Sequence, residues 1–206
     1  MEKIKTSIKG IVFLSVQGVE KNEIIPHHKI EKLIKEKSIP FVFLRPSYFM
    51  RNLTTTLYDD IKRENKIILP AGNALFNWVD VNDIAEVASV VMINFEQYKN
   101  EALEITGKEL KSFPQVVTQI NNQLSIDLKF KSVNPVRYFF YKKRQGYAIP
   151  KIMVMILLHF LPRFDKIPKL STNVEKILNR YPTDIETFIN NNESFFKRGE
   201  EPKTLG

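Results

Sequence analysis

The chain has 206 residues, of which 43% are hydrophobic and 26% are charged. This length and balance are typical of a folded protein with a sizeable core, and they exclude long disordered, collagen-like or fibrous architectures. There is no cysteine, which excludes disulfides, thiolate metal sites and cysteine nucleophiles and suits a reducing, cytoplasmic environment.

The net charge of +8 raises the question of nucleic-acid binding. The basic residues are scattered, and the only run is residues 142–144, so a solvated basic surface is favoured over a nucleic-acid site. Residues 1–9 lack the apolar region of a secretory signal, and the longest apolar stretch, residues 152–161, is about half of a bilayer span. We therefore expect neither a nucleic acid nor a membrane as a partner.

The first predicted elements are a strand, a helix and a strand. Residues 10–16 (GIVFLSV) form an apolar run typical of a strand buried on both faces. Residues 27–37 carry apolar side chains at helical spacing, and residues 41–44 (FVFL) form the next strand, which Pro46 ends. This spacing predicts a βαβ unit with parallel strands and a right-handed crossover.

The alternation continues to residue 111. Helices are predicted over residues 48–64 and 83–95. Asn82 is one candidate cap of the second, and the carboxylates of Asp80 and Asp83 are also expected to cap and orient it. The strands that accompany these helices are predicted at residues 67–69, 76–80 and 101–106. Residues 1–111 therefore form a predicted parallel α/β block.

Residues 112–206 have a different character and are predicted to form a smaller, mostly helical cap. An amphipathic helix after Ser112 leads to a half-exposed strand at residues 126–133. Further helices are predicted from Pro135 and over residues 150–161. A capping box from Thr183 to Glu186 is predicted to open the last helix.

Four segments, in order, resemble the NmrA-like branch of the short-chain dehydrogenase/reductase superfamily. Residues 10–20 resemble its fourth strand, and residues 27–31 with 39–53 (IPFVFLRPSYFMRNL) are similar to its next helix and fifth strand. Residues 76–85 (FNWVDVNDIA) and 174–191 resemble its strand-to-helix motif and its closing motif. Each motif is weak alone, but their order and spacing identify the chain as a member.

The resemblance implies a Rossmann-like, doubly wound parallel sheet that lacks its first three strands. The family begins with a glycine-rich turn, G-x-x-G-x-x-G, and with 7 glycines no such cluster exists here, so we expect an N-terminally truncated member. Residues 1–111 would then be the C-terminal half of an NAD(P)-binding domain, and residues 112–206 the substrate-side region. Residues 10–16 would form an exposed strand edge, through which we expect self-association.

The resemblance also implies which residues contact the dinucleotide. In the family, the loops after the fourth and fifth strands line the nicotinamide end of the cofactor, at the strand ends where open α/β sheets bind ligands. The residues at these positions are Ser15, Val16, Gln17, Pro46, Ser47, Tyr48 and Phe49. The alternative is that they only end a strand and begin a packed helix.

The superfamily's Tyr-x-x-x-Lys pair is absent from the expected helix, and His27 stands there with Glu31 one turn later. An imidazole near neutrality can donate a proton to a carbonyl or quinone, which makes His27 the candidate catalytic residue. A structural or cofactor-positioning role is the favoured alternative. Arg45 is expected to be a salt-bridged strand terminus, Trp78 to be core, and no metal site is expected.

Three functions remain open. The first is NAD(P)H-dependent reduction of a small carbonyl or quinone-type acceptor, in which the cofactor supplies the chemistry. The second is a non-catalytic module that senses the dinucleotide and binds a partner, and the third is an inactive truncated remnant. The choice between NAD and NADP is also open, because the residue that decides it follows the family's second strand.

Overall fold

The computed structural model describes residues 9–21, 23, 25–164 and 169–197. They form two compact units. The first is drawn from Met1–Phe49, Trp78–Lys108 and Leu170–Asp184, and the second from Met50–Asn77, Glu109–Lys169 and Ile185–Gly206. The chain thus passes between the units several times, whereas the sequence suggested one boundary at residue 111; that functional division stays a prediction.

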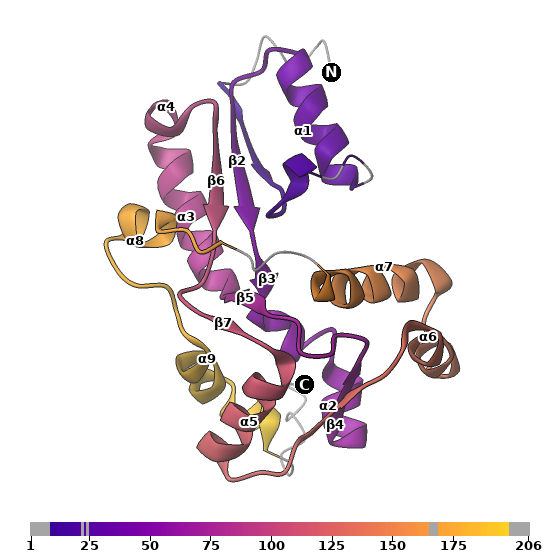
Figure 1. Ribbon diagram of the computed structural model, residues 1–206. Helices are drawn as coiled ribbons and strands as arrows, with labels where there is room; N and C mark the ends of the chain where they lie inside the picture. The colour runs from indigo at the N-terminus through magenta and orange to yellow at the C-terminus, as the bar shows by residue number, and fades with distance from the viewer. Residues whose placement is uncertain (1–8, 22, 24, 165–168, 198–206) are drawn as a thin grey trace, which may run out of the picture. The chain divides into compact units, whose positions relative to one another are not determined.

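The first unit contains a parallel sheet of three strands in the order β1-β2-β6 (Figure 1). These strands are β1 (Ile11–Leu14), β2 (Phe41–Pro46) and β6 (Glu101–Ile105). Helix α1 (Pro26–Glu36) connects β1 to β2, so the predicted βαβ unit is confirmed. Strand β1 is shorter than the predicted strand at residues 10–16, and it lies at the edge of this sheet.

Helices cover both faces of β2, because its alternate side chains point to opposite sides. Phe43 packs with Ile34 of α1 on one face. Val42 and Leu44 pack on the other face with Val87 of α3 (Val81–Ile93). The unit is therefore a mixed α/β layer structure, as predicted, with its core on both sides of a buried parallel strand. The short helices α4 (Phe95–Tyr98) and α8 (Asn173–Leu178) and the 3-10 turn η2 (Val19–Lys21) complete it.

Two predicted carboxylates lie at the start of helix α3. Its cap is Asp80, as predicted for this carboxylate, and not Asn82, the other predicted cap; the Asp80 carboxylate accepts the N–H of Asn82 at 2.7 Å. A carboxylate is favoured at this position by the helix dipole. Asp83 in the first turn is fully buried, and it accepts bonds from Thr183 and Arg180.

The predicted helix over residues 48–64 is wrong in its first half. Tyr48–Phe49 form strand β3, which pairs with the end of β5 (Phe76–Val79), and a 3-10 turn η3 (Met50–Leu53) follows. Only α2 (Tyr58–Glu64) is helical. Between them, Thr54 and Thr55 donate their hydroxyls to Arg51 O, local bonds that compete with helix formation.

The second unit contains two small pairings of strands. Strand β4 (Lys66–Leu69) is parallel to β8 (Lys129–Ser132), and β7 (Leu110–Lys111) is antiparallel to the first half of β5. Strand β8 is shorter than the predicted strand at residues 126–133. A capping box between Ser112 and Gln115 opens helix α5.

The helices of the second unit mostly follow the prediction. They are α5 (Phe113–Leu124), α6 (Pro135–Arg144), α7 (Ile149–Phe160), which the turn η4 (Leu161–Arg163) continues, α9 (Ile185–Asn191) and α10 (Glu193–Phe196). Pro135 stands at the start of α6 as expected. Among the residues covered by the structure, no helix is long and apolar enough to cross a membrane.

Helix α9 begins at Ile185, two residues after the predicted cap residue Thr183. The Thr183 N–H and hydroxyl donate to the Asp83 carboxylate at 2.7 and 3.0 Å, a tertiary contact that the predicted capping box did not include. A buried carboxylate needs donors, and Thr183 supplies two of them to Asp83.

Candidate functional site

The carboxyl ends of the three parallel strands of the first unit lie side by side. The N–H of Ser15 donates to Leu44 O at 2.7 Å, and the N–H of Gln17 donates to Pro46 O at 2.9 Å. The N–H of Ser47 donates to Ile105 O at 3.0 Å. The loops that start at Ser15 and at Pro46 are therefore adjacent at one sheet edge, where open α/β sheets bind ligands.

The structure separates the predicted contact residues into two groups. Ser15, Val16, Gln17, Pro46 and Ser47 lie at the strand ends just described. Tyr48 and Phe49 instead continue into β3, and both pack inward. The Tyr48 ring meets the Trp78 ring edge to face at 4.9 Å, and Phe49 packs against the core around Val79. Trp78 is core as expected. The packing of these two rings favours the structural alternative for them, while the dinucleotide contact of all seven residues stays a prediction.

A buried carboxylate joins the strand ends to helix α1. Glu31 is 4% exposed, and its Oε1 accepts the hydroxyl of Ser15 at 2.6 Å. Arg45, near the end of β2, donates to Glu31 Oε1 at 3.0 Å and to Oε2 at 2.6 Å. It also pairs with Glu20 at 3.2 Å, so the prediction that Arg45 is a salt-bridged strand terminus is confirmed.

Glu31 and Arg45 are both held in their charged forms. Burial raises the pKa of Glu31, but the hydrogen bonds from Arg45 and Ser15 outweigh it, and the net pKa lies below the usual range. The same bond to Glu31 raises the pKa of Arg45. A carboxylate in this state cannot donate a proton near neutrality, so Glu31 acts here as a fixed anion that orients Ser15 and Arg45.

The corner after β1 is open. Gln17 donates from Nε2 to Glu104 of β6 at 3.0 Å, which fixes the loop across the sheet edge. Gly18 follows with φ +76°, and, apart from its two chain neighbours, no atom of the residues that the structure describes lies within 4 Å of the place where its Cβ would stand. Backbone in this conformation suits glycine, and the free space lets another molecule approach it closely.

His27 stands in the first turn of α1, and its ring centroid lies 5.9 Å from that of Phe13. Its Nδ1 is buried and has no hydrogen-bond partner within the described ranges. Glu31, one turn later, is bound to Ser15 and Arg45 instead. His28 differs, because its Nδ1 lies 2.9 Å from Val19 O. A buried polar atom without a partner is uncommon, and a ligand could satisfy it.

Sequence reasoning missed the role of Glu31 as the centre of a buried ion pair. The signal was present, because Glu31 and Ile34 are three residues apart and share the inward face of α1. A carboxylate on the apolar face of a helix needs a cation, and Arg45 was the charged residue that ends the adjacent strand.

The chemistry of these groups is compatible with one end of a dinucleotide. The buried Nδ1 of His27 and the Ser15 hydroxyl oxygen are polar groups that a carboxamide, such as that of nicotinamide, could pair with. The sequence has no glycine-rich turn that would hold a pyrophosphate. In the part of the chain that the structure covers, no three His, Asp or Glu side chains gather as metal ligands would.

Comparison with known families and sequences gives a consistent result. The model of the NmrA-like family matches residues 17–199. The prestalk A differentiation protein A of Dictyostelium discoideum is 28% identical over 189 residues, covering 91% of this chain and 62% of that protein. Festuclavine synthase II of Penicillium roqueforti is 34% identical over 110 residues, covering 53% of this chain and 38% of that protein. The chain thus spans less than two thirds of the length of these relatives.

Solved structures share the fold. The triphenylmethane reductase of Citrobacter sp. complexed with NADP(H) superposes with a TM-score of 0.77 at 18% identity, covering 89% of this chain and 65% of that one. An NADPH-dependent quinone oxidoreductase of Escherichia coli superposes with a TM-score of 0.81 at 14% identity, covering 92% and 70%. The predicted Rossmann-like α/β class is therefore confirmed.

Proposed function

This chain is a member of the NmrA-like family, and from that premise we propose that it forms the nicotinamide side of an NAD(P)H-dependent reductase. The acceptor would be a small carbonyl or quinone-type molecule. The observation that carries this proposal is the convergence of Ser15, Gln17 and Pro46 at one sheet edge around the buried Glu31–Arg45 pair. Two solved structures of the same fold support it, because one is complexed with NADP(H) and the other is an NADPH-dependent enzyme.

Each side chain has a part in this proposal. Ser15 gives its hydroxyl hydrogen to Glu31, so its oxygen remains free to accept an N–H from a carboxamide. The open corner at Gly18 would admit the ring, and the buried Nδ1 of His27, in the first turn of α1, would be available to a bound group. The bound dinucleotide would supply the hydride, while the chain orients the ring and excludes water.

A second candidate is a module that binds the dinucleotide without catalysis. It is favoured by the state of His27, because Glu31 is committed to Arg45 and leaves the imidazole without a hydrogen-bonded carboxylate. In a working acid–base pair, the carboxylate would hold the imidazole in its tautomer and orientation. One named relative is a differentiation protein, which agrees with either candidate.

The direct test is a titration of the purified chain with NADPH and with NADH, followed by nicotinamide fluorescence. We expect one of them to bind, more weakly than a dinucleotide whose pyrophosphate is held by a glycine-rich turn. Ser15→Ala should weaken binding about tenfold, because it removes an acceptor hydrogen bond. Ser89→Ala is the matched control, since Ser89 is an exposed serine of α3. A folded chain that binds neither dinucleotide would overturn the proposal.

A measurement of quinone turnover distinguishes the reductase from the non-catalytic dinucleotide-binding module. If His27 donates a proton, His27→Gln should lower the kcat for quinone reduction and leave the Kd for the dinucleotide unchanged. His28→Gln should change neither value. Binding without reduction of any quinone or carbonyl tested would select the sensing module.

A further inference from the structure

After Lys151 in its first turn, helix α7 carries apolar side chains on its outward as well as its inward side, although only the inward side is in the core. The inward side chains of Ile152, Met155, Ile156 and His159 are buried. The outward side chains are apolar as well: Met153, Val154, Leu157 and Leu158 are 44, 63, 50 and 45% exposed. A helix that is hydrophobic all round is normally buried on every side. The exposed outward face of α7 therefore indicates a surface that binds another molecule.

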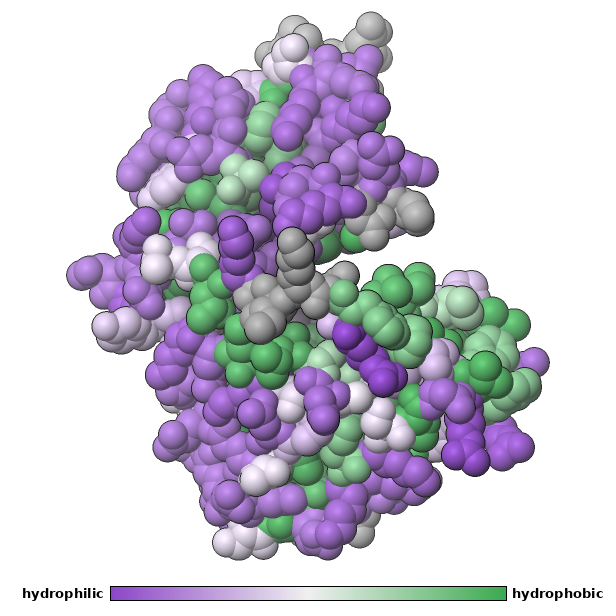
Figure 2. Space-filling view, in the orientation of Figure 1, coloured by the Kyte–Doolittle hydropathy of each residue, from purple (hydrophilic) through white to green (hydrophobic). Residues whose placement is uncertain are grey.

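Apolar side chains continue beyond this face. Leu161 and Phe164 follow α7 and are 44 and 72% exposed, while Val136 and Phe140 of the adjacent α6 are 65 and 55% exposed. Figure 2 shows the hydrophobic residues gathered over α7. We call this set, from Val136 to Phe164, the α6–α7 face. A patch of this kind on a protein surface marks a binding surface.

The charged side chains of the same segment are all positive. Residues 128–164 contain no aspartate or glutamate and carry eight lysines and arginines, which equals the net charge of +8 of the whole chain. These residues are Lys129, Lys131, Arg137, Lys142, Lys143, Arg144, Lys151 and Arg163. Lys142 is buried and neutralised by Asp60, Lys129 is exposed but paired with Asp127, and the other six are exposed. Outside residues 128–164 the basic and acidic residues are equal in number, at 23 each.

We propose that the α6–α7 face docks on the surface of an anionic lipid bilayer. Helix α7 would lie in the interface, with its outward side chains at the boundary of the acyl chains and the cations among the headgroups. A span is excluded, because its 12 residues reach about 18 Å against a hydrocarbon core of about 30 Å. This inference is independent of the proposed reductase function, and it replaces the expectation that no membrane is a partner.

Charge decides between the possible occupants of this face. A second copy would bring two unbalanced cationic segments together, which opposes pairing through α7. An anionic bilayer supplies acyl chains that can cover the apolar side chains and negative headgroups that balance the cations. An acidic protein would also supply the charge, and the experiment below distinguishes it.

The test is co-sedimentation of the full chain with vesicles of phosphatidylcholine alone and of phosphatidylcholine with phosphatidylserine. We expect binding to the second kind only. Raising the salt from 0.1 to 1 M should release the protein, because the Debye length falls from about 10 to about 3 Å.

Paired substitutions give the sharper evidence. Lys143→Gln with Arg144→Gln should weaken the vesicle affinity about 25-fold, at about fivefold for each cation removed. The matched control is Lys29→Gln with Lys32→Gln, two exposed lysines of α1, which should have no effect.

A second pair of substitutions tests how much the apolar side chains of α7 contribute to vesicle binding. Val154→Ser with Leu158→Ser should abolish sedimentation with the anionic vesicles. The control is Met92→Ser with Ile93→Ser, because these α3 side chains are 57 and 81% exposed. Circular dichroism confirms that each variant is folded.

Three outcomes would overturn the proposal. They are no binding to anionic vesicles by the folded chain, equal binding to both kinds of vesicle, or binding that the α7 pair leaves unchanged. Binding to soluble polyglutamate together with no vesicle binding would assign the face to an acidic protein instead.

Discussion

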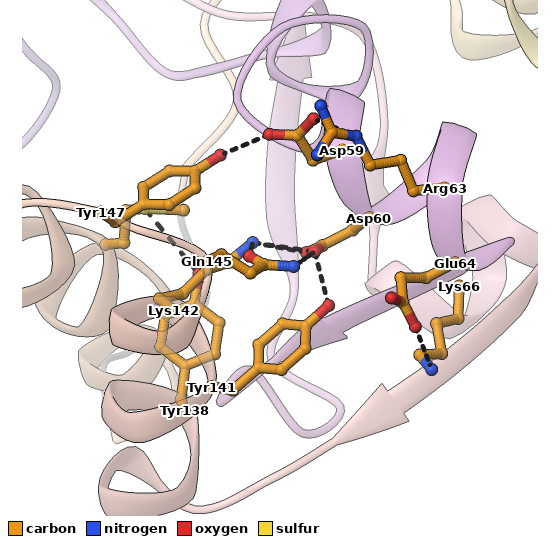
Figure 3. Close-up of polar contacts among 11 residues, drawn as sticks. Asp59, Asp60, Arg63, Glu64, Lys66, Tyr138, Tyr141, Lys142, Gln145 and Tyr147 are labelled. Atoms are coloured by element: carbon orange, nitrogen blue, oxygen red, sulfur yellow. Dashed lines mark hydrogen bonds and ion pairs between the residues drawn. The ribbon is translucent and has the colours of Figure 1, made fainter.

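The ammonium group of Lys142 donates to both carboxylate oxygens of Asp60 at 2.9 Å, and neither side chain has any exposed surface (Figure 3). Tyr141 also donates to Asp60 at 2.8 Å. Gln145 donates from Nε2 to Asp60 at 3.3 Å, and its Oε1 accepts from Lys142 at 3.0 Å. Burial and the bond to Asp60 raise the pKa of Tyr141, so its phenol stays a donor. The network ties α2 to α6 within the second unit.

Removing the cation from this network should be strongly destabilising. Lys142→Met leaves the Asp60 carboxylate buried without its counter-charge, which costs about 3–5 kcal/mol of unfolding free energy. Urea unfolding, followed by circular dichroism, measures it. Lys143→Met is the control, and as a substitution of an exposed neighbour it should change stability by about 0.5 kcal/mol or less.

Removing both charges should be less harmful than removing one. In the double variant Asp60→Leu with Lys142→Met, no buried charge is left unpaired, and we expect part of the lost stability to return. If the double variant is as unstable as the sum of the two single ones, the loss comes from packing and not from the unpaired charge.

Gly107 provides a separate steric prediction. A Cβ at this position would lie 1.7 Å from the carbonyl oxygen of Trp78, a backbone atom that cannot move aside. Gly107→Ala should therefore destabilise the first unit by about 3 kcal/mol or more. Gly18→Ala is the comparison, because there only the positive φ is unfavourable, at about 1 kcal/mol. Equal losses for the two variants would contradict the steric explanation.

Local patterns predicted most of the fold. The βαβ unit followed from apolar runs separated by an amphipathic stretch, and Pro135 marked the start of α6 because its ring is tolerated at that position. The wrong helix at residues 48–57 reflects both local threonine bonds and the pairing of β3 with β5. Long-range bonds were not predictable at all: the Thr183 hydroxyl donates to Asp83, which is 100 residues away in the sequence. No local pattern carries that information.

The site was predictable to a similar extent. The resemblance placed Ser15 and Pro46 at adjacent strand ends, and the parallel register brings them together. It did not reveal that Glu31 would bind Arg45 and Ser15 in place of His27. That choice depends on burial and geometry, because a buried carboxylate takes the cation that lies within reach.

Acid should weaken the protein through His159. Burial lowers the pKa of this histidine from 6.5 to about 4, so the unfolded chain binds its proton first as the pH falls. The contribution of neutral His159 to stability is complete above pH 6.5 and is lost progressively between 6.5 and 4, by about 3 kcal/mol in all. Urea unfolding at several pH values in this window measures the slope.

The variant His159→Gln isolates this contribution. It cannot take up a proton, so its stability should fall less between pH 6.5 and 4 than that of the unsubstituted chain. His28→Gln, which changes a partly exposed histidine, serves as the control. Parallel pH slopes for His159→Gln and the unsubstituted chain would show that other groups cause the acid sensitivity.

Strand β1 should make the chain self-associate. Within the described residues, β1 pairs only with β2, so its other edge presents backbone donors and acceptors beside apolar side chains. Such an edge is a template for another strand.

Leu14, which is 49% exposed, lies at the end of this strand, and Leu14→Lys places a charge on it, which should disfavour pairing. Size-exclusion chromatography over a range of concentrations should show larger species for the unsubstituted chain and mainly monomer for the variant. Ile93→Lys, at an exposed position of α3, should behave like the unsubstituted chain. A monomer at every concentration before any substitution would mean that this edge is protected by a feature other than charge.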